Sequence, residues 1–114
     1  MYTLKFHKTL TTAKWVKFSG AQQILMIANE LNRAKNSILR GDEEETKECY
    51  ERAMELLDLT ICVSSKRNKR RELLRFRELL GLEYLTVKKD VSRIETLTKS
   101  LILLDKDAFN VLSP

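Results

Sequence analysis

Residues that form turns are scarce in this chain, and their scarcity limits the folds open to it. The 114 residues include three glycines and one proline, and the proline is the last residue. A β-sandwich or β-barrel needs many more turn residues, so these folds are excluded. Hydrophobic residues make up 43% of the chain, too many for a disordered protein. The length suits one domain with its own core, and we expect residues 1–114 to form a single all-α domain.

Four segments carry apolar side chains at the spacing of an amphipathic helix. We expect helices over residues 19–40, 42–63, 69–85 and 90–104, packed as an antiparallel bundle of about four helices. Ser19 and Gln22 suit a capping box, Gly41 suits a left-handed helix end, and Asp42 suits a helix cap. The first two helices should therefore form a tight hairpin. The expected core residues are Ile24, Ile27, Ala28, Leu31, Ala34, Ile38, Cys49, Tyr50, Ala53, Leu56, Leu57, Thr60, Ile61, Leu73, Phe76, Leu80, Tyr84, Val91, Ile94, Leu97, Leu101 and Leu104.

Two parts of the chain fit more than one interpretation. Residues 2–6 alternate apolar and polar side chains as in a short strand, whereas residues 11–18 suit a capped helix start. We favour an irregular or partly helical arm over residues 1–18, which packs Trp15 and Phe18 on the bundle. Residues 86–90 suit a break between the third and fourth helices, although no glycine or proline prevents the two from fusing.

The cysteines and the apolar runs bear on the compartment. Cys49 and Cys62 lie 13 positions apart in one expected helix, about 20 Å along its axis. That separation is too large for a disulfide, so we expect free thiols in a reducing cytoplasm. The longest apolar runs are far shorter than the roughly 20 residues of a membrane span. The basic N-terminus lacks the apolar region of a secretory signal, and no membrane role is expected.

Charge is divided unevenly between neighbouring helices. Residues 42–58 carry eight acidic side chains against two basic ones, and residues 64–78 carry seven basic against two acidic. Cations at a helix start oppose the helix dipole, so a basic start needs a compensating partner. The acidic second helix is one such partner; nucleic-acid phosphate or an acidic protein surface is another. The candidate contact residues are Lys66, Arg67, Lys69, Arg70, Arg71, Arg75 and Arg77.

Catalytic and metal-binding patterns are missing from the sequence. The single histidine, His7, has no identifiable orienting partner and cannot supply the histidine pairs of a di-iron bundle. Two distant cysteines give no zinc-finger spacing, and isolated glycines give no phosphate-binding loop. We expect no cofactor, metal or small-molecule ligand. Glu30 lies at the edge of the apolar stripe, and we expect it to meet Arg75 or Arg77 across the bundle.

One set of motifs extends over residues 21–80. It comprises Ile27, Glu30, Arg33 and Ala34, then Gly41-Asp42, then Glu51-Arg52-Ala53 with Leu56 and Asp58-Leu59-Thr60, and then residues 71–78. This pattern resembles a group of small prokaryotic helical-bundle proteins. The resemblance implies a helical bundle and brings no activity with it. Residues 41–58 also resemble the second helix of a tetratricopeptide repeat, but the pattern occurs once and such repeats need about three copies.

These observations favour a non-enzymatic interaction module that self-associates or docks a protein partner. Leu25, Met26 and Leu39 flank the main apolar stripe of the first helix, and a helix with two apolar faces is typical of contact with a second protomer. The alternative is an accessory protein that binds nucleic acid through the basic cluster at residues 66–77. Phosphate contacts there would make affinity depend on salt.

Overall fold

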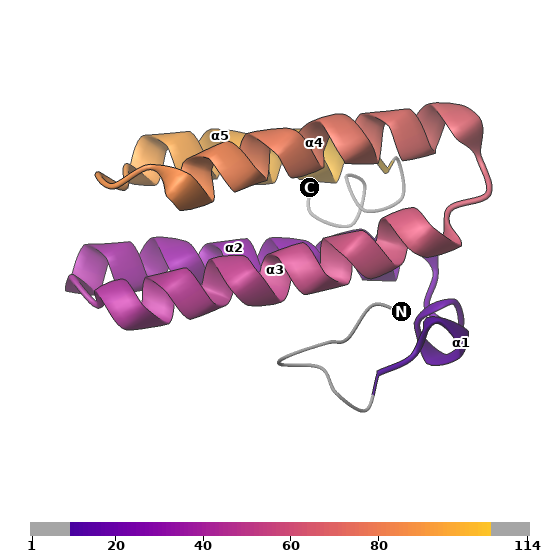
Figure 1. Cartoon of the computed structure of the whole chain (residues 1–114), viewed down its shortest axis with the longest axis horizontal. Helices are drawn as coiled ribbons and strands as arrows, with labels where there is room; N and C mark the ends of the chain where they lie inside the picture. Colours follow the sequence, from indigo (N-terminus) through magenta and orange to yellow (C-terminus); the bar gives the residue numbers. More distant parts are fainter. Residues whose placement is uncertain (1–9, 106–114) are drawn as a thin grey trace, which may run out of the picture.

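The computed structural model describes residues 10–105 and is all-helical over that range. Its helices are α1 (Thr12–Trp15), α2 (Gly20–Arg40), α3 (Glu43–Val63), α4 (Arg67–Leu85) and α5 (Val91–Leu103). The four long helices pack antiparallel in the order of the chain: α2 against α3 and α5, and α4 against α3 and α5 (Figure 1). The prediction of an all-α antiparallel bundle is confirmed, with α1 as a short addition beside α3.

The α2–α3 hairpin forms as its end signals predict. The Ser19 hydroxyl accepts from the Gln22 backbone N–H at 3.1 Å, and the Gln22 side chain accepts from the Ser19 N–H at 2.8 Å. Gly41 ends α2 with φ 73°, a left-handed conformation that glycine adopts without strain. The Asp42 side chain then accepts from the Glu45 N–H at 3.0 Å and starts α3. A single glycine therefore reverses the chain between two 21-residue helices.

The core lies between the four long helices and agrees with most of the expected stripes. Seventeen of the expected residues are buried, whereas the other five are partly exposed: Ile38, Tyr84, Val91, Leu97 and Leu104. Of these, Tyr84, Val91 and Leu104 lie at helix ends, where neighbours cover them from fewer sides. Cys49 is buried and Cys62 is exposed, and both are free thiols.

Trp15 anchors the segment before α2. Its side chain is fully buried, and its indole N–H donates to the Thr60 hydroxyl of α3 at 3.0 Å. The buried Gln23 side chain donates to the carbonyl oxygens of Trp15 and Phe18 and holds the turn between α1 and α2. Phe18 lies against the Trp15 ring and remains partly exposed. The expected packing of Trp15 is confirmed, whereas residues 1–9, including the possible strand, lie outside the described residues.

The third and fourth long helices are separate, and Lys89 stabilises the corner between them. The Lys89 ammonium donates to the carbonyls of Glu83, Tyr84 and Thr86 at 2.6–2.7 Å. These carbonyls lie at the negative end of α4, where a cation is favourable. Partial burial of the amine lowers the pKa of Lys89 from its usual value. The contacts of Lys89 stabilise the end of α4, although no glycine or proline marks the break in the sequence.

We predict that two glycine substitutions change stability in opposite directions. Gly41→Ala should lower the free energy of unfolding by about 1 kcal/mol, because an L side chain is strained at φ 73°. No atom lies within 4 Å of a Cβ added at Gly41, so the cost is one of backbone conformation. Gly81→Ala, inside α4, should instead raise stability by up to about 1 kcal/mol through helix propensity. Urea denaturation followed by circular dichroism measures both free energies. Equal effects of the two substitutions would contradict a left-handed Gly41 and a helical Gly81.

Candidate functional site

The basic cluster lies at the start of α4. The helix begins at Arg67, two residues before the expected start, and Lys66 is its N-cap. The Lys66 side chain makes no capping hydrogen bond, and no acidic residue occupies the first turn. The prediction missed this start because no capping side chain marks it. Uncapped backbone N–H groups and several cations therefore share the positive end of one helix.

Three of the seven candidate cations have acidic neighbours. Lys69 pairs with Asp105 at 3.4 Å, and Arg77 pairs with Asp58 of α3 at 2.9 Å. Arg75 approaches Glu72 of its own helix at 4.0 Å, an exposed contact of little energetic value. One interpretation of the basic cluster was that it pairs with the acidic α3 helix. Among the described ion pairs, Arg77 makes such a contact.

The other four cations, Lys66, Arg67, Arg70 and Arg71, face solvent. All four are exposed, and none has an ion-pair partner within the described part of the chain. They are concentrated within the first two turns of α4. Their mutual repulsion and the helix dipole both disfavour this arrangement, so an anionic partner would relieve both.

Exposed leucines continue along the same helix. Leu74 is 47% exposed, Leu82 64% and Leu85 74%, although a large apolar side chain gains most when it is buried. The positions 67, 71, 74, 78, 82 and 85 recur at three- and four-residue intervals, so they follow one side of α4. We call this side the α4 outer face; it comprises Arg67, Arg71, Leu74, Glu78, Leu82 and Leu85, with Arg70 and Arg75 beside it.

The α4 outer face is divided along its length of about 27 Å. Its first turns are cationic and its last turns are apolar, with Leu74 and Glu78 between them, and the exposed Leu79 and, after the end of α4, Val87 add apolar surface nearby. Sequence analysis found the cations and missed the leucines, because it assigned Leu73, Phe76 and Leu80 to the core and left the remaining leucines without a role. Their helical spacing is the signal that could have identified them.

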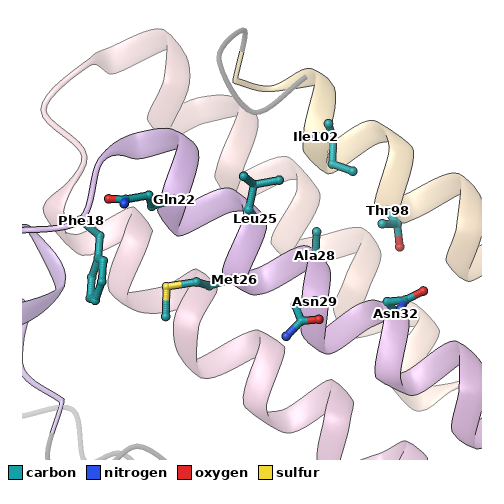
Figure 2. A pocket seen from close by; sticks show the side chains of 9 residues that line it. All are labelled: Phe18, Gln22, Leu25, Met26, Ala28, Asn29, Asn32, Thr98 and Ile102. Carbon is teal, nitrogen blue, oxygen red and sulfur yellow. The ribbon is translucent and has the colours of Figure 1, made fainter. Parts of the chain in front are cut away.

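A second open surface is the groove between α2 and α5. It has a volume of about 740 Å³. Leu25 and Ala28 of α2 point toward Thr98 and Ile102 of α5, and Phe18 lies near the start of α2 (Figure 2). None of the side chains that line the groove is charged: Phe18, Gln22, Leu25, Met26, Ala28, Asn29, Asn32, Thr98 and Ile102. In a chain with 32% charged residues, an uncharged groove suits an uncharged, partly apolar occupant.

Arg52 is the centre of a partly buried polar network between α2 and α3. Its guanidinium donates to Glu30 at 3.0 Å and to Glu45 at 2.9 Å. The expectation that Glu30 meets Arg75 or Arg77 is wrong, because Glu30 faces the neighbouring α3 helix rather than α4. The residue that meets Glu30 across the bundle is Arg52 of α3, to which the sequence analysis assigned no role.

The titration of the network follows from its geometry. Burial opposes the charge on Arg52, but the hydrogen bonds with Glu30 and Glu45 outweigh it and raise the pKa of Arg52. The same hydrogen bond from Arg52 lowers the pKa of Glu45. The stabilisation from Glu45 is therefore present above its unfolded-state pKa and is lost as the pH falls through its lower folded-state pKa. Burial raises the pKa of the Cys49 thiol, which makes it a poor nucleophile at neutral pH. We interpret this network as structural.

Residues 10–105 contain no group of three or more His, Cys, Asp or Glu side chains placed to hold a metal ion. His7 lies outside the described residues. No helix in the described range is long and apolar enough to cross a membrane. Comparison with protein-family models, curated proteins and solved structures gives no significant match. The part of the chain that the structure describes is all-helical, and the resemblance to prokaryotic helical bundles stays a prediction.

We predict that Arg52→Met lowers the free energy of unfolding by about 2 kcal/mol, because it leaves the buried Glu30 carboxylate, among the described cations, with only the exposed Arg33 guanidinium, 3.6 Å away. Replacing both partners, as Arg52→Met with Glu30→Leu, should recover part of that loss. Arg75→Met is the matched control, since its exposed contact with Glu72 should cost under about 0.5 kcal/mol. Urea denaturation compares the three proteins, and equal effects of Arg52→Met and Arg75→Met would show that the network is not structural.

Proposed function

We propose that this chain is a non-enzymatic interaction module of the cytoplasm that docks a protein partner on the α4 outer face. The partner presents a helix with acidic residues at one end and apolar residues at the other. The observation that carries the proposal is the continuity of exposed arginines and exposed leucines along one side of α4. The resemblance to small prokaryotic helical bundles brings no activity and is compatible with such a role.

Electrostatics supports an acidic partner. Lys66, Arg67, Arg70 and Arg71 share the positive end of the α4 dipole. Acidic groups placed there would steer encounter and fix the orientation of the partner. Charge complementarity of this kind contributes more to specificity and association rate than to affinity. Another interaction must then supply most of the binding energy.

The leucines supply that interaction. Leu74, Leu82 and Leu85 are each about half to three-quarters exposed, and covering each would contribute roughly 1 kcal/mol. Apolar side chains in the covered centre of an interface, with charges at its rim, are typical of protein–protein contacts. An amphipathic helix is the partner shape that fits this surface, because a helix laid along α4 would contact both its cations and its leucines.

Nucleic acid is the second candidate, because the four solvent-facing cations would also suit phosphate. A phosphate backbone would contact the cationic half of α4 and leave the leucines in water. No aromatic side chain lies among the cations to stack on bases. These two points favour the protein partner.

We predict that two different substitutions on α4 weaken docking. A photoreactive phenylalanine analogue in place of Leu82 should cross-link one partner in the source cells, and the same analogue in place of Thr96 on α5 should not. With that partner purified, the triple variant Arg67→Glu/Arg70→Glu/Arg71→Glu and the single variant Leu82→Asp should each weaken binding at least about tenfold. Thr96→Asp should bind as the wild type does. No cross-link specific to position 82 would contradict the proposal.

Fluorescence anisotropy with labelled RNA and duplex DNA separates the two candidates. The proposal predicts weak binding that the Leu82→Asp variant leaves unchanged. Micromolar or tighter binding that falls steeply with salt, and that disappears when Lys66, Arg67, Lys69, Arg70 and Arg71 are neutralised, would instead establish the nucleic-acid function.

A further inference from the structure

The side of α2 that faces away from its own core carries an uncharged stripe. We call it the α2 seam; it comprises Gln22, Leu25, Asn29, Asn32, Asn36 and Leu39. Leu25 is partly exposed, and the other five are exposed. The opposite side of α2 carries the buried Ile27, Leu31 and Ala34. The helix therefore has an apolar face, edged by the buried Glu30, that the bundle uses, and an uncharged face that it does not use.

The spacing of the α2 seam is that of a helix-pairing surface. Its positions alternate intervals of three and four residues, which is the pattern of a and d positions in a coiled coil. The pattern covers nearly the whole of α2, 21 residues or about three heptads. Four charged residues occur in α2, Glu30, Arg33, Lys35 and Arg40, and none of them lies in the seam. An ordinary solvent-facing helix side carries charges instead.

The seam is complementary to a copy of itself. Asparagine and glutamine amides both donate and accept hydrogen bonds, so one amide can satisfy another across a two-fold axis. A stripe of lysines or glutamates would repel its own copy. A single asparagine at such a position is also known to fix register and partner number, at a cost in stability. An uncharged amide stripe with leucines near both ends therefore suits a second copy of this chain better than a charged partner.

We propose that two copies of this chain pair through their α2 seams in an antiparallel arrangement. The orientation follows from charge. In a parallel pair, Lys35 of one copy would lie beside Arg40 of the other. In an antiparallel pair, the C-terminal half of α2 lies beside residues 20–29, which carry no charge. The arrangement that covers the whole seam then sets Gln22 against Leu39, Leu25 against Asn36, and Asn29 against Asn32 of the other copy.

The groove beside the seam supplies apolar surface for the same contact. Four residues belong to both the seam and the groove lining, so a helix laid on the seam would cover the groove between α2 and α5: Gln22, Leu25, Asn29 and Asn32. Phe18 is 37% exposed, Met26 38% and Leu39 68%. Covering them would add apolar burial to the amide contacts. This pairing uses a different face from the α4 docking proposed above, so either proposal can fail alone.

The molar mass in solution tests the pairing. By multi-angle light scattering of the full chain, we expect twice the chain mass at high concentration. Asn29→Lys with Asn32→Lys places four cations at the centre of the pair, so this variant should be a monomer. Thr96→Lys with Ser100→Lys, two exposed positions of α5, adds the same charge elsewhere and should stay dimeric. The dimer should persist in high salt, because no charge lies in the seam.

Engineered cysteines test the orientation. In a Cys62→Ser background, Gln22→Cys and Leu39→Cys combined in one chain should give a covalent dimer under mild oxidation. Each cysteine alone should give none, because the antiparallel arrangement separates it from its own copy by about 25 Å. Covalent dimers from the Gln22→Cys variant alone would overturn the antiparallel orientation.

A monomeric wild-type chain at every concentration would overturn the pairing itself. The groove would then be open to a different protein or to the terminal segments of this chain. That result would leave the α4 docking proposal standing, since its variants and its cross-linking test lie on another helix. A dimer that dissociates in high salt and is unaffected by the asparagine variant would place the contact on the charged helices and would also overturn the α2 assignment.

Discussion

The contact between α2 and α3 is the constraint on which the rest of the structure depends. Every other helix packs on one of these two: α1 and α4 on α3, and α5 on α2. Gly41 reverses the chain between them, and the Arg52 guanidinium joins them through Glu30 at 3.0 Å. A short reversal and a buried charge pair set the relative register of two long helices. The α4 and α5 helices then close the open side of that pair.

The four packed helices leave charged and apolar side chains on the surface that no described residue pairs with or covers. Inside the bundle, Gln23, Thr60 and Arg52 have hydrogen-bond partners, whereas the Tyr50 hydroxyl and one Glu83 carboxylate oxygen are buried without one among the described residues. On the outside, α4 shows cations without a described acid and leucines without cover, and α2 shows an uncharged seam. These two faces belong to helices that make no extensive contact with each other within the bundle. One molecule can therefore pair through α2 and dock a partner through α4 at the same time.

Local signals in the sequence were enough to predict most of the fold. The Ser19 capping box, the left-handed Gly41 and the Asp42 cap each depend on residues a few positions apart, and all three are confirmed. Contacts between distant residues were harder to predict. Glu30 was assigned to α4, and its partner is Arg52, because helical periodicity says which side of a helix is buried but not which neighbour it meets. The start of α4 was missed because Lys66 offers no capping signal.

The candidate surfaces were predictable to a similar extent. The cations of residues 66–77 are visible in the sequence as a run, whereas the structure was needed to show which of them pair with Asp58 or Asp105. The exposed Leu74, Leu82 and Leu85 follow a second helical stripe that a search for the core passes over. Of the α2 seam, the sequence analysis singled out Leu25 and Leu39, together with the neighbouring Met26. Its asparagines gained a role once the opposite face of α2 was known to fill the core.

Backbone amide chemical shifts, recorded by ¹H–¹⁵N NMR from micromolar to millimolar protein, test the central claim most directly: that the bundle is complete within and binds through α2. We expect concentration-dependent shifts at Leu25, Asn29, Asn32 and Asn36, with little change in the buried residues of α3 or along α4. Shifts that stay constant while the chain has the molar mass of a monomer, or that change along α3 and α4 instead, would contradict the account.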